Sequence, residues 1–240
     1  MATVSQATFL FLPVELRLHI ATYAFDQPRD AGLTSPTAGW LDTEYDPSVY
    51  LSILLVCRQF HDDFAQLAFQ KTRFIVKRDD FTGSIRNLRV EKLRALRKLA
   101  IRHRGLAIFE WHRYPFNNEN LRLDELCIAT DDRDCGRFTG LLRRLQHVKT
   151  IRILPGTAVA PAVYARLAGA MYKEDHYQRY DAPDAPDVGH VWFEPSFVEK
   201  DLSIGLVAKA PQPVVVEEEY MNAIKSKIEE LVDIMAHQTI

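Results

Sequence analysis

Four short clusters in the sequence combine residue types that can bind metal ions or line a pocket. His61–Asp63 and Asp131–Cys135 hold imidazole, carboxylate and thiol groups, which are the usual ligands of transition metals. Trp111–Tyr114 and the pair Asp175-His176 place histidine among aromatic and charged neighbours. The tyrosines near the last pair are Tyr172, Tyr177 and Tyr180. Any enzymatic chemistry is expected at one of these clusters.

The spacing within these clusters argues against a catalytic or metal site. Adjacent residues on a helix diverge, so His61–Asp63 cannot converge on one ion, and Asp131–Cys135 is typical of a solvated turn. The sequence has no glycine-rich phosphate loop, no G-x-S-x-G and no H-E-x-x-H. We therefore predict no catalytic residue, no metal and no cofactor. A small-molecule pocket lined by the aromatic-histidine clusters, or an enzyme without a recognisable motif, is the open alternative.

Composition indicates an ordinary folded chain with room for one large core, or for a small leading module on a larger body. The 240 residues are 47% hydrophobic and 26% charged. Cys57, Cys127 and Cys135 are odd in number and fit no disulfide or zinc spacing, which favours free thiols in a reducing compartment. No apolar run approaches the length of a membrane span. We expect an intracellular protein, cytoplasmic or nuclear, without a membrane partner.

Charge is unevenly distributed, although the net charge is only -2. Lys71 to Arg104 contains twelve basic and three acidic residues, whereas the chain from Glu174 onward contains fourteen acidic and five basic residues. These blocks either face each other, or are separately solvated, or the first is a basic docking face for an acidic partner. The candidate basic face is Arg94, Arg97, Lys98 and Arg102. Nucleic-acid binding through residues 71–104 is the weaker alternative, because the basic residues alternate with leucines as on a solvated amphipathic face.

Two helical regions are expected in the first part of the chain. Pro13 suits a first helical turn, and the stripe that follows consists of Leu16, Ile20, Tyr23 and Ala24. A loop rich in glycine, proline, threonine and serine spans residues 31–39. Asp46 and Pro47 then begin a second helical region that extends to about Gln70. Its apolar positions predict one continuous buried seam: Ile53, Cys57, Phe60, Phe64 and Leu67.

A repeated apolar spacing follows in the second part of the chain. In Leu96-Arg97-Lys98-Leu99-Ala100-Ile101 the first, fourth and sixth positions are apolar, and the same spacing recurs at Leu123/Leu126/Ile128 and at Val148/Ile151/Ile153. This pattern fits the L-x-x-L-x-L core of leucine-rich repeats, without the asparagine that normally closes it. An unrelated α/β layer is the alternative. A terminal amphipathic helix is expected, with the following apolar stripe: Met221, Ile224, Ile228, Leu231 and Met235.

The two helical regions together resemble a known family. Leu12-Pro13-Val14-Glu15 before a helix is similar to the opening of F-box modules, and Leu54–Phe60 (Leu-Leu-Val-Cys-Arg-Gln-Phe) resembles a helix of F-box-like proteins in filamentous fungi. The following Arg73-Phe74 resembles the strand that comes next in that group. The segment between the two halves is longer than in F-box modules, and Phe60 stands where tryptophan is expected.

The resemblance implies a non-catalytic adaptor. In F-box proteins the helical module binds Skp1, the linker of a cullin-type ubiquitin ligase, and the rest of the chain selects a protein substrate. The implied contact residues are Leu12, Pro13, Leu16, Ile20, Leu55, Val56, Cys57, Arg58 and Phe60. The alternative is that these apolar residues are buried against the body with no partner.

The sequence thus predicts an α+β fold in two parts. Residues 1–76 would form an F-box-like helical module with a long internal loop, and residues 77–240 an irregular leucine-rich-repeat-like α/β body with a C-terminal amphipathic helix. The expected partners are a Skp1-like adaptor and an unknown protein substrate. A standalone interaction protein remains an alternative.

Overall fold

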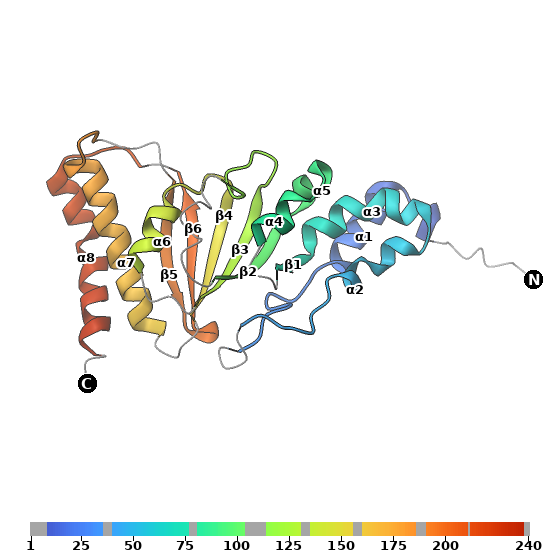
Figure 1. The fold of residues 1–240 in the computed structure, drawn as a ribbon, viewed down its shortest axis with the longest axis horizontal. Helices are drawn as coiled ribbons and strands as arrows, with labels where there is room; N and C mark the ends of the chain where they lie inside the picture. The colour runs from blue at the N-terminus through green and yellow to red at the C-terminus, as the bar shows by residue number, and fades with distance from the viewer. Residues whose placement is uncertain are drawn as a thin grey trace, which may run out of the picture.

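A six-stranded sheet is the centre of the computed structural model (Figure 1). The structure describes residues 9–35, 40–76, 81–103, 114–130, 135–155, 160–185, 191–210 and 212–237. The strand order is β1-β2-β3-β4-β6-β5. The strands are β1 (Arg73–Val76), β2 (Lys98–His103), β3 (Leu123–Thr130), β4 (Val148–Pro155), β5 (Trp192–Val198) and β6 (Ser203–Lys209). Strands β1 to β4 are parallel, and β6 and β5 join them as an antiparallel pair. The expected combination of helices and strands is confirmed.

The repeated apolar spacing lies on neighbouring strands in register. Leu99 of β2 pairs with Leu126 of β3, and Leu126 pairs with Ile151 of β4. The sixth positions of the three units are aligned in the same way, as are Leu123 and Val148. All nine apolar positions of the three units are buried in one core cluster. The fourth and sixth side chains of each unit, two residues apart, point to the same face of the sheet, and the first joins the same core where the chain enters the strand.

Helices cover that face, which we call the helix face (Figure 1). The helices are α4 (Phe81–Arg86), α5 (Val90–Ala95), α6 (Cys135–Leu142), α7 (Ala160–His176) and α8 (Glu217–Ala236). Of these, α4, α5 and α6 lie in connections between parallel strands, whose fixed handedness places them on one side of the sheet. The stripe predicted for α8 is only partly buried: Leu231 is in the core, whereas Met221 and Met235 are exposed. Helix α8 packs on α7 near the end of the sheet rather than across its centre, so one row of side chains is enough to anchor it.

The first part of the chain forms a separate helical cluster, which we call the helical module. It consists of η1 (Phe9–Phe11), α1 (Val14–Ala24), α2 (Ser48–Leu51), η3 (Ser52–Leu55) and α3 (Arg58–Lys71). Its core contains Ala21, Phe25, Leu54, Phe64 and Ala68. Figure 1 shows the module beyond the β1 edge of the sheet. Strand β1 follows directly after α3 and connects the module to the sheet.

The helical region predicted from Pro47 to about Gln70 forms as three helices, α2, η3 and α3, and its predicted apolar seam is interrupted at Cys57, whereas Ile53, Phe60, Phe64 and Leu67 pack in the module core. The chain leaves helical geometry at Cys57, whose backbone is extended with φ -160° and ψ 167°, and α3 begins at the next residue. The Cys57 carbonyl accepts the first α3 bond, from the His61 backbone N–H at 3.2 Å. This break turns the chain so that Leu54 and Phe64 both reach the module core. Cys57 itself is only half-buried.

The long segment between α1 and α2 is an ordered covering layer rather than a free loop. Its described parts, residues 27–35 and 40–46, cross the side of the sheet opposite the helices, and we call this segment the strap and that side the strap face. Trp40 and Leu41 pack there on Ala100, Cys127 and Ala129, and on Leu154. These small strand residues leave room for an extended chain to approach the sheet closely. Strands β1 to β4 are therefore covered on both sides, whereas on β6 the strap-side residue Val207 is exposed.

Buried arginines hold the strap to the sheet. Arg73 of β1 donates from Nη1 to the carbonyls of Arg29 and Ala31, at 2.7 and 2.9 Å. Arg152 of β4 donates from Nη1 to Asp30 Oδ1 at 2.9 Å. Charge-assisted bonds of this kind are stronger than neutral ones. The strap is therefore fixed by polar contacts from two strands.

Two backbone positions in the strap show how close this approach is. Gly32 has a φ of 73°, and a Cβ there would collide with Ile75 Cδ1. Trp40 has a φ of 67°, a left-handed conformation that costs about 1–3 kcal/mol in a residue other than glycine. Its indole is buried and donates from Nε1 to the Pro155 carbonyl at 2.6 Å. Burial of the ring and this bond offset the strain.

Candidate protein-interaction site

The apolar residues predicted on the first helix lie on its outward face. In α1, Leu16 is 51% exposed and Ile20 is 46% exposed. Ala21 faces the module core, as does Phe25, which follows the helix. Since residues at i, i+4 and i+7 share one helix face, Tyr23 extends the same outward stripe. The alternative that these residues are buried against the body is wrong for Leu16 and Ile20.

A buried arginine sets this orientation of α1. Arg17 Nη2 lies 2.7 Å from Asp63 Oδ2 of α3, and Arg17 Nε donates to the same carboxylate at 2.9 Å. Arg17 Nη1 also donates to the Leu10 and Leu12 carbonyls, at 3.2 and 2.6 Å. The guanidinium therefore binds the start of α1 to α3. With Arg17 turned inward, its neighbour Leu16 faces solvent.

The second predicted group of contact residues lies at the junction of η3 and α3. Leu55 is 86% exposed and Val56 is 66% exposed, and the Arg58 side chain is almost fully exposed. Phe60 instead packs inward, with its ring 5.5 Å from that of Phe9 and 5.3 Å from that of Phe64. The break at Cys57 explains this difference, because it rotates α3 relative to the preceding 3-10 turn.

Six of the nine predicted contact residues are therefore exposed. These are Pro13, Leu16, Ile20, Leu55, Val56 and Arg58. Leu12, Cys57 and Phe60 are half-buried. The starts of α1 and α3 lie together at the end of the module farthest from the sheet (Figure 1), as the Phe9–Phe60 contact also shows. The structure thus presents both sequence halves on one small helical unit.

Sequence reasoning missed two strongly exposed apolar side chains of the module. Phe11 is 82% exposed, and Val49 in α2 is also mostly exposed. Phe11 belongs to the apolar run Phe9–Leu12, whose inward partners, such as Phe9, cannot be separated from its outward ones by composition. The available signal was the spacing of the two phenylalanines. On a 3-10 turn with three residues per turn, side chains two residues apart point to different sides, so Phe9 and Phe11 cannot both face the core.

The predicted basic face does not form one surface. Ala100 of β2 belongs to the strap face, so alternation along the strand places Lys98 and Arg102 on that side. Arg94 lies on α5 at the helix face, and Arg97 donates from Nη1 to the Arg122 carbonyl at 2.9 Å. No ion pair between described residues joins the basic block to the acidic block after Glu174. The two blocks are not held together by direct salt bridges within the described ranges.

The pair Asp175-His176 divides between two roles. His176 and the nearby Tyr172 line an apolar pocket of about 310 Å³ between α7 and α8, as the sequence allowed, whereas Asp175 belongs to a buried structural network. Asp175 is buried and accepts bonds from Tyr220 Oη at 2.8 Å and from Arg179 Nε at 2.9 Å. Burial and the adjacent Asp175 carboxylate raise the pKa of Tyr220. His176 Nε2 lies 2.8 Å from Glu217 Oε1 of α8. These contacts join α7 to the start of α8, which explains the charged and aromatic composition of the cluster.

The remaining chemical clusters are separated or fall outside the description. On α3, Asp63 pairs with Arg17, whereas His61 is exposed on another side. Residues 111–113 and 131–134 lie outside the described residues. Within the described part of the chain, no group of three or more histidine, cysteine or acidic side chains could hold a metal ion. No described helix is both long and apolar enough to cross a membrane.

Cys127 on the strap face is a buried thiol. It is fully enclosed, and its Sγ lies 3.4 Å from Glu125 Oε1. Burial, followed by the nearby Glu125 carboxylate, raises the pKa of this thiol to about 12. A thiol with such a pKa stays protonated and is a poor nucleophile. Cys127 therefore packs as a small apolar residue.

Comparison with known proteins gives no match. Protein-family models, curated proteins and solved structures all lack a significant match to this chain.

Proposed function

We propose that this chain is a non-catalytic protein-interaction adaptor that resembles the F-box substrate receptors of cullin-type ubiquitin ligases. The observation that supports it is the outward orientation of Leu16, Ile20, Leu55 and Val56 on the helical module. These residues come from both halves of the F-box-like sequence pattern. The α/β body would then hold the surface that selects a protein substrate.

Exposed apolar side chains on a small helical unit favour a partner over a purely structural role. Scattered single apolar residues on a surface are normal, but contiguous exposed apolar patches mark interaction sites. Here Leu55 and Val56 are adjacent and among the most exposed apolar residues described. Contact with a partner would remove them from water, and this burial would favour binding by about 25 cal/mol per Å² of apolar area.

Co-expression with Skp1 tests the proposal. The wild-type chain should co-purify with Skp1 as a stable complex. The double variant Leu55→Asp/Val56→Asp should weaken binding by about 30-fold or more, the effect of losing a hot spot of about 2 kcal/mol. Leu16→Asp/Ile20→Asp should act in the same direction. Isothermal titration with purified Skp1 would measure the change.

Val216→Asp is the matched control. Val216 is also exposed, but it precedes α8, where an aspartate suits a helix cap. The Val216→Asp variant should bind Skp1 with the same affinity as the wild type. Circular dichroism should show that all variants remain folded, because each changed side chain is at least half or nearly half exposed. Absence of wild-type binding at micromolar Skp1 would contradict the ligase interpretation.

A further inference from the structure

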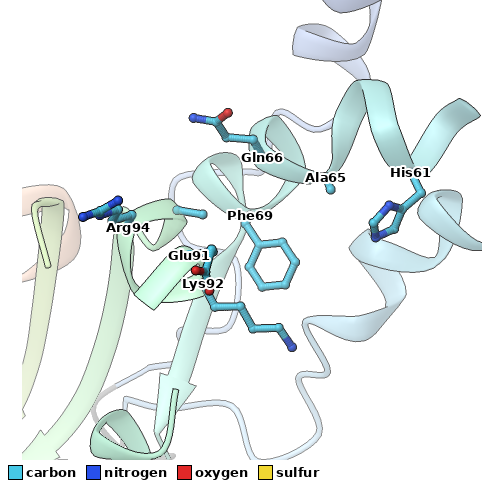
Figure 2. Close-up of a pocket in the computed structure, with 8 residues that line it drawn as sticks. His61, Ala65, Gln66, Phe69, Glu91, Lys92 and Arg94 are labelled. Atoms are coloured by element: carbon cyan, nitrogen blue, oxygen red, sulfur yellow. The ribbon is translucent and has the colours of Figure 1, made fainter. Parts of the chain in front are cut away.

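A pocket of about 460 Å³ lies between α3 and α5, where the helical module meets the α/β body (Figure 2). Its apolar lining is Ala65 and Phe69 from α3 and Ala95 from α5. The Phe69 ring stacks on Phe74 of β1, with 5.5 Å between centroids and an interplanar angle of 21°. Pockets of this size and character hold ligands or ligand side chains. The stacked rings give the pocket a preformed apolar wall.

The rim of this pocket is polar, with two basic residues and one acidic residue. Lys92 and Arg94 extend from α5, with Glu91 beside them, while His61 and Gln66 extend from α3 (Figure 2). All five side chains are exposed. Long basic side chains can add their methylene stems to the apolar wall while their charged ends stay in water. The site therefore combines an apolar interior with a cationic edge.

The surrounding sequence strengthens this positive charge. From Arg86 to Arg94, along α4, α5 and the turn between them, there are four basic residues, and Glu91 is the one acidic residue. Within the described residues, neither Arg89 nor Lys92 has a carboxylate at ion-pair distance. Nearby like charges at this density attract an anionic partner and repel a cationic one.

Arg94 is held in place by a neighbouring loop. Its Nε donates to Asn120 Oδ1 at 2.9 Å. Within the described chain its two Nη groups have no partner, and a guanidinium can bind a carboxylate through such a pair of donors. Arg94 is therefore partly pre-organised to bind an acidic group at the edge of the pocket.

We propose that this pocket binds an acidic segment of a partner protein, which inserts one apolar side chain between α3 and α5. Carboxylates flanking that side chain pair with Arg94 and Lys92. A nucleic acid would match the charge, but its phosphates would not use the apolar wall formed by Ala65, Phe69 and Ala95. The inference does not depend on Skp1 binding, because it uses none of the exposed apolar residues of the helical module.

Fluorescence polarisation with short labelled peptides tests the site. The probes are acidic peptides with a central leucine, phenylalanine or tryptophan, a matched acidic peptide with a central serine, and a basic peptide with a central leucine. At least one apolar-centred acidic peptide should bind at micromolar concentration, about tenfold more tightly than the serine peptide. The basic peptide should not bind. Added salt should weaken the interaction.

Three variants locate the binding on the full-length chain. Arg94→Glu should weaken binding by about tenfold or more, because it replaces an attractive contact with a repulsive one. Gln66→Trp, at an exposed rim position, should also weaken it by filling the pocket. Glu91→Gln should strengthen it by removing the acidic group from the rim. Arg166→Glu on α7 is the charge-matched control and should leave affinity unchanged.

Several results would overturn the inference. One is that no apolar-centred acidic peptide binds, and another is that the serine peptide binds equally well. Equal effects of Arg94→Glu and Arg166→Glu would show a response to net charge rather than to this pocket. Tighter binding of a short DNA duplex than of every acidic peptide, with loss in Arg94→Glu, would assign the surface to nucleic acid instead.

Discussion

The two faces of the sheet are buried by different means. On the helix face, large aliphatic residues such as Leu126 and Ile151 pack against helices. On the strap face, the adjacent Cys127 is one of several small residues, and the cover is an extended chain held by Arg73 and Arg152. The helix face gains stability mainly from apolar area, whereas the strap face depends on a few directional polar bonds. The stability of the strap face is therefore concentrated in two arginines, whereas that of the helix face is spread over many apolar side chains.

Arg73→Met should cause the largest loss of stability. It removes the partner of Glu125, whose carboxylate lies 2.8 Å from Arg73 Nη2, and the donor to two strap carbonyls. Breaking a buried ion pair on one side costs about 3–5 kcal/mol. Urea denaturation of the variant would measure the change in unfolding free energy.

Adding Glu125→Gln to Arg73→Met is the control. It removes the unpaired carboxylate and should recover part of the loss. If the double variant is as unstable as the single one, the strap carbonyls rather than Glu125 account for the effect. A loss below about 1 kcal/mol in Arg73→Met would contradict the view that polar bonds hold the strap face.

Leu126→Ala and Cys127→Ala compare the two faces directly, because the residues are neighbours on β3 and both are fully buried. Leu126→Ala should cost about 2–5 kcal/mol through the cavity it leaves. Cys127→Ala removes a single heavy atom and should cost about 0.5–1.5 kcal/mol, as does the loss of one buried methylene. Denaturant titrations of both variants provide the measurement. Equal losses would contradict the distinction between the faces.

The free energy of unfolding should also fall at alkaline pH, because of the Cys127 thiol on the strap face. The pKa of Cys127 is about 12 in the folded chain and near its ordinary value of 9 when unfolded. Between these values the unfolded chain holds fewer protons, so the free energy of unfolding falls as pH rises, by at most about 1.4 kcal/mol per pH unit. Below pH 9 the full contribution is present.

Unfolding measured at several pH values from about 8 to about 11 tests this slope. Buried tyrosines such as Tyr220 and Tyr45 have raised pKa values and act in the same direction. The difference between the wild type and Cys127→Ala isolates the contribution of the thiol. Identical slopes would show that the Cys127 thiol has the same pKa in the folded and the unfolded state, which would contradict the prediction.

The sequence predicted the helix face well and the strap face poorly. The spacing of Leu99 and Ile101, repeated in the next two units, reports side-chain alternation, which is a local property. The strap depends on contacts between distant positions, such as Trp40 with Pro155. No periodicity marks such a contact. Its glycine- and proline-rich composition resembled that of a surface loop.

The candidate site shows the same division between local and distant effects. The outward direction of Leu16 and Ile20 follows from Arg17, whose partner Asp63 lies on another helix. A short apolar stripe alone does not distinguish core from interface. The α3–α5 pocket escaped prediction because Phe69 and Arg94 come from segments that meet only in the folded chain.

The strap has a consequence for how two partners would bind together. The helical module is joined to the sheet through the strap and through β1, rather than by a flexible linker. A ligand at Leu55 and another in the α3–α5 pocket would therefore be held at a nearly constant separation. For a bivalent ligand, the effective concentration at the second site is set by this spacing, and avidity disappears when the ligand cannot span it. With its two sites held at this spacing, the protein would discriminate between bivalent ligands by their length as well as by their chemistry.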